Sequence, residues 1–143
     1  LDAFGVQGHL SAAGFREAFD ARAYRRFLRD LADRGLDILI TELDVLDDDL
    51  PADPAIRDKA IAEATKRYLD VALDEPAVKS VMAFGLSDRY TWLQEDYPRE
   101  DGAPRRPLPY DEDLQPKPMR RALARELDDA DRRRMLWRLL RRS

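Results

Sequence analysis

Three strand-like runs alternate along the chain with helix-forming segments, and this alternation limits the possible folds more than any other feature. The runs cover residues 4–10, 36–45 and 78–86. A helix is predicted between Asp20, a suitable N-cap, and Gly35, a suitable C′ residue. Strands that alternate with helices form parallel sheets, because each helix carries the chain back to the start of the next strand. The sequence therefore predicts an α/β fold with a parallel sheet.

Two further helices complete this pattern. Asp53-Pro54 resembles a helix start, with a capping residue followed by proline, and the helix is predicted to continue to about Leu73. A proline-rich loop from about Gln94 to Pro118 leads to a last helix that begins near Met119. Three parallel strands leave two unpaired edges, whereas a (β/α)8 barrel needs eight strands in about 250 residues. We therefore expect a missing N-terminal portion, and the start of the chain looks internal, with neither Met nor a signal-peptide pattern.

The composition excludes several classes of function. The chain has 25 Lys and Arg against 29 Asp and Glu, a net charge of -4, which gives no overall basic field to recruit nucleic acid. No apolar run approaches the roughly 18 residues of a membrane span. The chain has no cysteine, which excludes disulfides, thiolate nucleophiles and thiolate metal sites. The one histidine, His9, must therefore carry any imidazole chemistry.

Two carboxylates stand two residues apart at the end of the second run. Side chains on a strand alternate between faces, so Glu42 and Asp44 are predicted to leave the same face as Ile38 and Ile40. One interpretation is that the strand has ended and both acids lie in solvent. The other is that the strand lines a barrel whose carboxyl end opens into an active site. By itself the pair favours the first interpretation, because acidic residues are ordinary at strand ends.

Four motifs occur in an order and spacing that resemble the last three barrel units of glycoside hydrolase family 10, the endo-1,4-β-xylanases. The motifs are GVQGHL at 5–10, ITELDV at 40–45, FGLSDRYTWL at 84–93 and RPLPYDEDLQPKP at 106–118. The resemblance covers nearly the whole chain, to about Leu127. It implies that the chain is the C-terminal portion, about three βα units, of a (β/α)8 barrel and is incomplete as a barrel by itself. The implied substrate is xylan or a xylo-oligosaccharide, cleaved in the β-1,4-linked main chain with retention of configuration.

The resemblance also implies roles for three polar residues. Retaining hydrolysis needs two carboxyl groups about 5 to 5.5 Å apart, one as proton donor and one as nucleophile that forms a glycosyl-enzyme. Glu42 falls on the family's nucleophile, His9 on the histidine that hydrogen-bonds it, and Asp44 on the carboxylate that orients this histidine. No cofactor is implied, because carboxyl groups fill both roles, and no metal is expected.

Three further residues fall on the substrate-binding positions of the family. Gln7 precedes His9 by two residues on the same predicted face and matches a glutamine that contacts the sugar being cleaved. Trp92 matches a tryptophan that stacks on the sugar, although a lone tryptophan is more often part of a core. Phe84 stands where the family commonly has tryptophan, so one aromatic wall of the subsite is smaller.

One departure from the family pattern concerns the part of the barrel that precedes this chain. The family's acid/base glutamate lies on an earlier strand, and its motif is absent, so the 143-residue fragment alone is predicted to be inactive. The missing N-terminal half of the barrel is then an expected partner. Enzymes of this family act outside the cell, so a secreted or periplasmic location is expected, although the chain shows no signal segment.

The chain divides into residues 1–127, the barrel part, and residues 128–143, an arginine-rich helical extension. The extension interleaves six arginines with five apolar residues: Arg132, Arg133, Arg134, Arg138, Arg141 and Arg142, with Met135, Leu136, Trp137, Leu139 and Leu140. An amphipathic end to the last helix is favoured over a helix that binds a membrane surface or an acidic partner. A non-catalytic xylan-binding or scaffold fragment is the other alternative.

Overall fold

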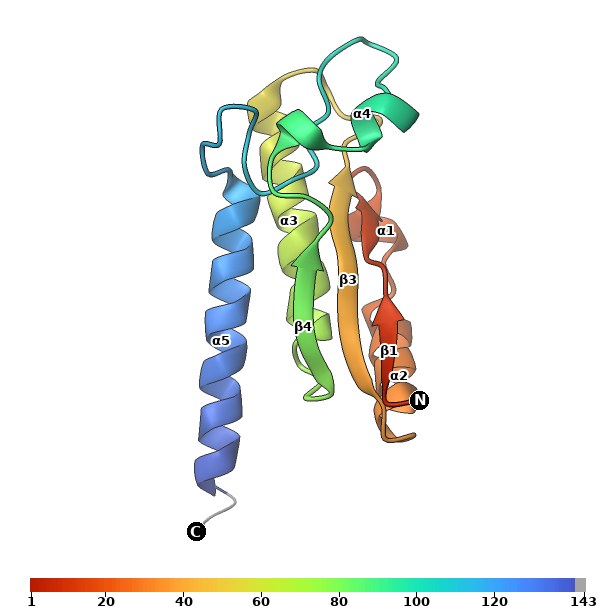
Figure 1. The fold of residues 1–143 in the computed structure, drawn as a ribbon, viewed down its shortest axis with the longest axis vertical. Coiled ribbons are helices and arrows are strands. Elements are labelled where there is room, and N and C mark those ends of the chain that lie inside the picture. The colour runs from red at the N-terminus through yellow and green to blue at the C-terminus, as the bar shows by residue number, and fades with distance from the viewer. Residues whose placement is uncertain (141–143) are drawn as a thin grey trace.

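A computed structural model describes residues 1–140, without the side chains of Arg16 and of residues 137–140. Its sheet contains four parallel segments, β1 (Ala3–Val6), β2 (His9–Ser11), β3 (Asp37–Leu46) and β4 (Val78–Ala83). The central strand is β3, because β1 and β2 pair with one side of it and β4 pairs with the other. The predicted parallel α/β order is therefore present (Figure 1).

The first predicted strand, 4–10, is interrupted in the middle. β1 pairs with the first half of β3, with Val6 opposite Ile40, and β2 pairs with its end. Between them Gly8 has a φ of 86°, and a Cβ there would lie 3.1 Å from Ile40 Cγ2. Glycine is therefore required at this position by both its backbone conformation and the close approach of the neighbouring strand.

The helices begin largely where the capping residues predict. The α-helices are α1 (Phe15–Ala18), α2 (Ala21–Ala32), α3 (Pro54–Ala72), α4 (Leu93–Asp96) and α5 (Pro118–Leu140), and η1 (Asp88–Tyr90) is a 3-10 turn. The Asp20 side chain accepts hydrogen bonds from two backbone N–H groups of α2, and Asp53 accepts one from Ala55 of α3. Gly35 has a φ of 75° and lies two residues beyond the C-cap Asp33. The helix therefore ends one residue earlier than expected if Gly35 were the C′ residue. The short elements α1, η1 and α4 carry too little periodicity to be predicted.

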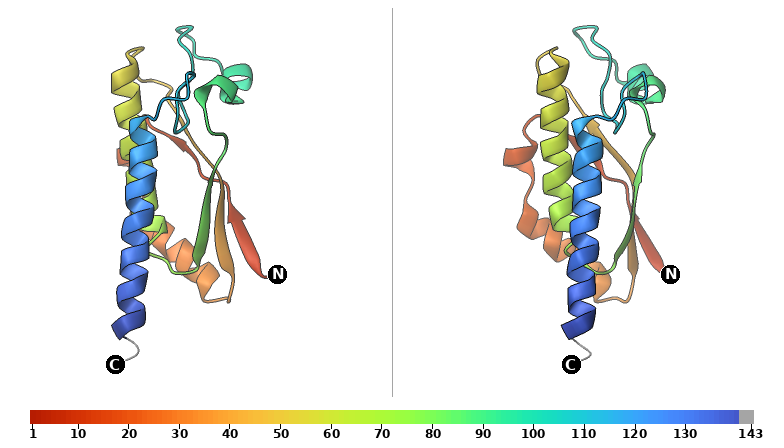
Figure 2. Two further views of the ribbon diagram at one scale, coloured as in Figure 1. Left: turned by 60° about the vertical axis from the view of Figure 1, so that its left-hand side comes forward. Right: turned by 90° about the vertical axis from the view of Figure 1, so that its left-hand side faces the viewer.

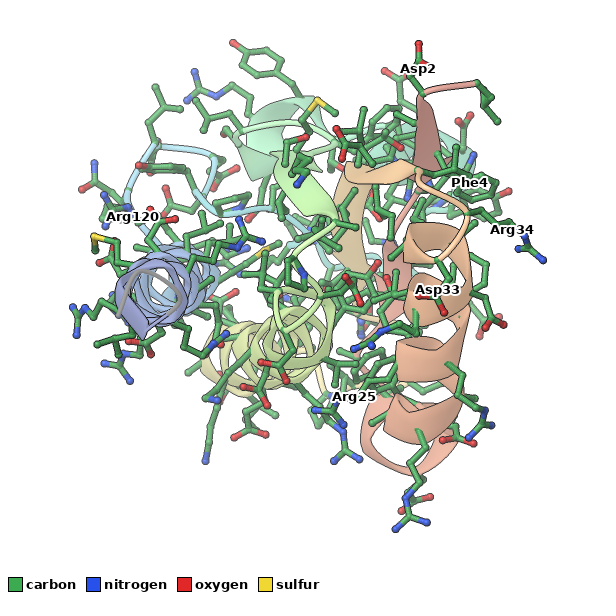
Figure 3. All side chains as sticks on the ribbon, turned by 90° about the horizontal axis from the view of Figure 1, so that it is seen from below. Asp2, Phe4, Arg25, Asp33, Arg34 and Arg120 are labelled. Atoms are coloured by element: carbon green, nitrogen blue, oxygen red, sulfur yellow. The ribbon has the colours of Figure 1, made fainter. Side chains whose placement is uncertain are left out.

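The core lies between the sheet and the long helices, which all cover one face of the sheet (Figures 2 and 3). Seen from below, α3 and α5 stand side by side along this face, and α2 lies beside β1 (Figure 3). The core contains Leu28 and Leu31 of α2, Ile61, Tyr68 and Leu69 of α3, and Met119 of α5. The sequence predicts an apolar stripe on α3, formed by Ile56, Ala60, Ala64, Tyr68, Val71 and Ala72. This prediction is wrong at the start of α3, because Ile56 is exposed and Arg57 is buried.

Within the described residues the sheet has two strand positions with only one neighbour each, β4 and the interrupted strand β1/β2. The molecule is therefore an open, partial α/β structure. The loops that follow β3 and β4 gather at the carboxyl ends of the strands, while the end of α5 projects past their other ends (Figure 1). None of the helices within residues 1–140 is both long and apolar enough to cross a membrane.

Candidate active site

A β-bulge in β3 aims two carboxylates away from the helices. Between the pairs Val6–Ile40 and His9–Asp44, β3 contains one residue more than its neighbour, and a register shift also separates Ile40 from Leu43 on the β4 side. Ile38, Ile40, Leu43 and Val45 all lie in the helix-facing core despite the odd spacing. The prediction that Glu42 and Asp44 share a face with Ile38 and Ile40 is therefore wrong. The extra residue places the two carboxylates on the other face of the sheet from these isoleucines.

His9 lies between these carboxylates and hydrogen-bonds both. Its Nδ1 is 2.8 Å from Asp44 Oδ1, and its Nε2 is 3.1 Å from Glu42 Oε2. The Asp44 side chain is fully buried, whereas 30% of the Glu42 side chain is exposed. The bulge and the pairing of β2 with β3 thus bring together three residues from two separate segments. Only Glu42 of the two carboxylates remains accessible to a ligand.

The charge on His9 follows from its two partners. An ionised carboxylate only accepts hydrogen bonds, so both ring nitrogens carry a proton when Glu42 and Asp44 are ionised. Partial burial lowers the pKa of His9, but the hydrogen bonds and charges of Asp44 and then Glu42 outweigh it and raise that pKa above its ordinary value. Below this raised pKa the ring is an imidazolium that compensates the two adjacent carboxylates.

We expect Asp44→Asn to lower the pKa of His9, because it removes the buried negative charge that favours the imidazolium. A pH titration of the imidazole NMR signals measures this directly, since the chain has one histidine. The raised pKa contributes stability that is fully present below the unfolded value of about 6.5 and is lost as the pH rises through the folded-state pKa. The exposed Asp30→Asn is the control. An unchanged or higher His9 pKa in Asp44→Asn would contradict the assigned coupling.

Two predicted aromatic residues surround His9. Phe84 and Trp92 each place a ring centroid 5.5 Å from the imidazole, and their own centroids are 6.1 Å apart. Phe84 is 42% exposed. The Trp92 indole N–H also donates a 2.8 Å hydrogen bond to Asp44 Oδ2, which the sequence did not predict. Tyr97 packs edge-on against Trp92 and is a further aromatic that sequence reasoning missed.

Gln7 lies in the interruption between β1 and β2. Its backbone carbonyl accepts a hydrogen bond from Glu42 N at 2.8 Å, and its side chain is exposed. The two neighbours of Gln7 lie on the helix-facing side of the sheet: Val6 packs against the core, and Gly8 lies close to the Ile40 side chain. Gln7 is therefore placed beside Glu42 with a side chain free to contact a ligand.

A buried charge cluster behind the site joins the two loops that follow β3 and β4. Asp47 is fully buried and accepts hydrogen bonds from Arg57 of α3 at 2.8 Å and from Arg105 of the long loop at 3.0 Å. Arg99 also donates to the Asp47 backbone carbonyl. Asp47 begins the acidic run 47–49, and nothing local in the sequence shows that distant arginines reach it.

A second buried ion pair fixes the turn that carries Trp92. Asp88 at the start of η1 accepts hydrogen bonds from Lys117 Nζ at 2.7 Å and from Leu108 N at 3.0 Å. Burial raises the pKa of Asp88 to about 6, against the opposing effect of Lys117. Asp88 therefore connects η1 to the loop before α5. Within residues 1–140 no group of His, Asp and Glu side chains is arranged to hold a metal ion.

Comparison with known proteins identifies relatives that are similar to this chain in sequence and in fold. The model of glycosyl hydrolase family 10 matches residues 1–126. Endo-1,4-beta-xylanase B of Thermotoga neapolitana is 30% identical over 118 residues, which is 82% of this chain and 32% of the relative. The crystal structure of xylanase 10B from Thermotoga maritima matches 90% of this chain with 31% identity and a TM-score of 0.76, and 37% of that protein is covered. The corresponding structure from Thermotoga petrophila, in complex with xylobiose, has a TM-score of 0.74.

The chain spans about a third of the length of these relatives. The shared part contains the parallel strands and covering helices of this open structure, and the matched xylanases are (β/α)8 barrels. The family match covers β1 to β4, with Glu42, Asp44 and His9, and ends at Glu126 within α5. The chain therefore belongs to glycosyl hydrolase family 10 and has the fold of part of its (β/α)8 barrel.

Proposed function

We propose that this chain forms the C-terminal part of a retaining endo-1,4-β-xylanase and supplies the nucleophile, Glu42. The observation that supports this most directly is the His9 bridge, which holds an accessible carboxylate beside a fully buried one at the carboxyl edge of a parallel sheet. Catalytic groups of such barrels lie at this edge. The names of the family relatives support xylan as the substrate class.

In the proposed mechanism a Glu42 oxygen attacks the anomeric carbon as the glycosidic bond breaks, and water later hydrolyses the covalent glycosyl-enzyme. His9 donates to Glu42 Oε2 and so orients the carboxylate, while Asp44 fixes the imidazole through Nδ1. The proton for the leaving oxygen comes from a glutamate on another strand of the barrel, about 5 to 5.5 Å from Glu42. No cofactor takes part in this scheme.

Substrate contact is proposed for Gln7, Phe84 and Trp92. The exposed ring of Phe84 and the half-buried ring of Trp92 offer flat apolar surfaces beside His9, the partner of Glu42, and such surfaces suit the apolar face of a pyranose. Gln7 adds an exposed amide that can donate to and accept from sugar hydroxyls. Because xylan is a polymer outside the cell, we propose that the enzyme acts there.

Covalent labelling tests the proposal against a non-catalytic xylan-binding fragment. A 2-deoxy-2-fluoro-xylobioside with a good leaving group should trap the glycosyl-enzyme, and peptide mass spectrometry should place the label on Glu42. The experiment uses the complete barrel, with Glu63→Ala, on the exposed side of α3, as the control that keeps labelling. Binding of xylo-oligosaccharide without any label on Glu42 would support the scaffold alternative.

We predict that the 143-residue chain alone does not hydrolyse xylan, because it lacks the proton donor and because general acid catalysis supplies about 10² to 10⁴ in rate. Release of reducing sugars from xylan measures the activity. The complete barrel is the positive control, and the chain with Glu42→Ala sets the background. Turnover by the purified chain above that background would contradict the proposed division of the active site.

The extension, residues 128–143, is proposed to be a structural end of the last helix. Arg134 donates to the Val78 carbonyl at 2.7 Å, and Arg133 lies 3.5 Å from Asp74. Within the described residues α5 is one continuous helix through position 140, and Met135 and Leu136 are exposed. Arg141 and Arg142 lie outside the described residues. If the extension were an interaction module instead, deletion of residues 128–143 would abolish binding of its partner and leave sugar binding intact.

A further inference from the structure

Asp44 has two donors, and they come from opposite sides of β3. Its Oδ1 accepts from His9 on β2, and its Oδ2 accepts from the Trp92 indole N–H, both at 2.8 Å. The carboxylate is fully buried, so it depends on these donors to compensate the loss of water. Removal of either donor would leave one oxygen of a buried charge without a side-chain partner.

The backbone around Trp92 is fixed, so its N–H has a defined direction. Its neighbours Thr91 and Leu93 are buried, and Leu93 N donates to Thr91 Oγ1. The Trp92 carbonyl accepts from Glu95 N and Asp96 N, each at 3.1 Å, in the turn of α4. The backbone of Trp92 is therefore fixed by its buried neighbours and by the turn of α4, and not by a ligand or by the contact with Asp44.

We propose that Trp92 is a positioning residue whose indole N–H holds Asp44 and, through Asp44 and His9, fixes the Glu42 carboxylate. The chain of contacts runs from the loop after β4 to β3, then to β2, and back to β3. This role is distinct from the stacking of the indole ring on a sugar, because it requires the nitrogen and not the ring surface. The inference rests on the proposed function of Glu42.

Replacement of Trp92 by 3-benzothienylalanine in the complete barrel tests the nitrogen alone, because sulfur replaces N–H and the bicyclic ring is kept. We expect kcat to fall about tenfold to a hundredfold, the rate equivalent of one hydrogen bond to a charged group, with KM nearly unchanged. The NMR-measured pKa of His9 should rise, because Asp44 loses a donor and its charge attracts the imidazole proton more strongly. The His9 signal is identified by its loss in His9→Asn.

Trp92→Phe, which loses both N–H and ring area, should show the same rise in the His9 pKa together with a higher KM. Glu63→Ala, on the exposed side of α3, should leave both measurements unchanged. Wild-type kcat in the benzothienyl variant, or a fall in kcat without a change in the His9 pKa, would overturn the proposal. The titration does not depend on turnover, so it still reports on the Trp92–Asp44 contact if labelling shows that Glu42 is not the nucleophile.

Discussion

Glu42→Ala is expected to abolish xylan hydrolysis by the complete barrel, with kcat reduced about 10⁴-fold or more, the scale seen when a nucleophile is removed. The reason is that the variant has no group to attack the anomeric carbon, while the binding surface of Gln7, Phe84 and Trp92 stays in place. KM should therefore change much less than kcat. Initial rates of release of reducing sugars, measured against protein of confirmed purity, test this expectation.

The fold of the variant must be shown to be intact, because Glu42 also accepts from His9. Circular dichroism and binding of a xylo-oligosaccharide serve this purpose, and Glu63→Ala on the exposed side of α3 is the matched carboxylate control. Activity of Glu42→Ala within tenfold of wild type would refute the assignment of the nucleophile. A comparable loss in Glu63→Ala would show that the effect is not specific to Glu42.

The alternation of strand-like runs with long helices could be predicted from the sequence. Caps such as Asp20 and Asp53 act within a few residues of themselves, so their effect can be predicted from local sequence. The proximity of His9 to Glu42 and Asp44 was predicted through the family motifs. The parallel pairing of β2 with β3 then places His9 opposite Asp44.

The orientation of the carboxylates could not be predicted from the pattern of alternation. A strand of ten residues with an inserted bulge has the same apolar composition as a regular strand, and only the pairing with both neighbours shows the extra residue. The Trp92 hydrogen bond to Asp44 likewise joins residues 48 positions apart. Long-range contacts of this kind carry no local signal.

The burial of Asp47 has the largest expected consequence for stability. The carboxylate lies between Arg57 and Arg105, whose side chains are each 2% exposed, and it has no exposed surface itself. The Arg57 guanidinium also donates to the carbonyls of Ala52 and Pro104. The cluster thereby fastens the long loop, which leads from Trp92 to α5, onto the start of α3.

Asp47→Ala is expected to lower the free energy of unfolding by about 3 to 5 kcal/mol, because it leaves the charges of Arg57 and Arg105 buried without their shared partner. Urea-induced unfolding followed by circular dichroism measures the loss. The control is Asp49→Asn in the same loop, since Asp49 is exposed and its φ of 57° is one that asparagine tolerates. This control should stay within about 0.5 kcal/mol of wild type. A loss below about 1 kcal/mol in Asp47→Ala would mean that water or Asp48 compensates the arginines, and the cluster would then not be what fastens the loop.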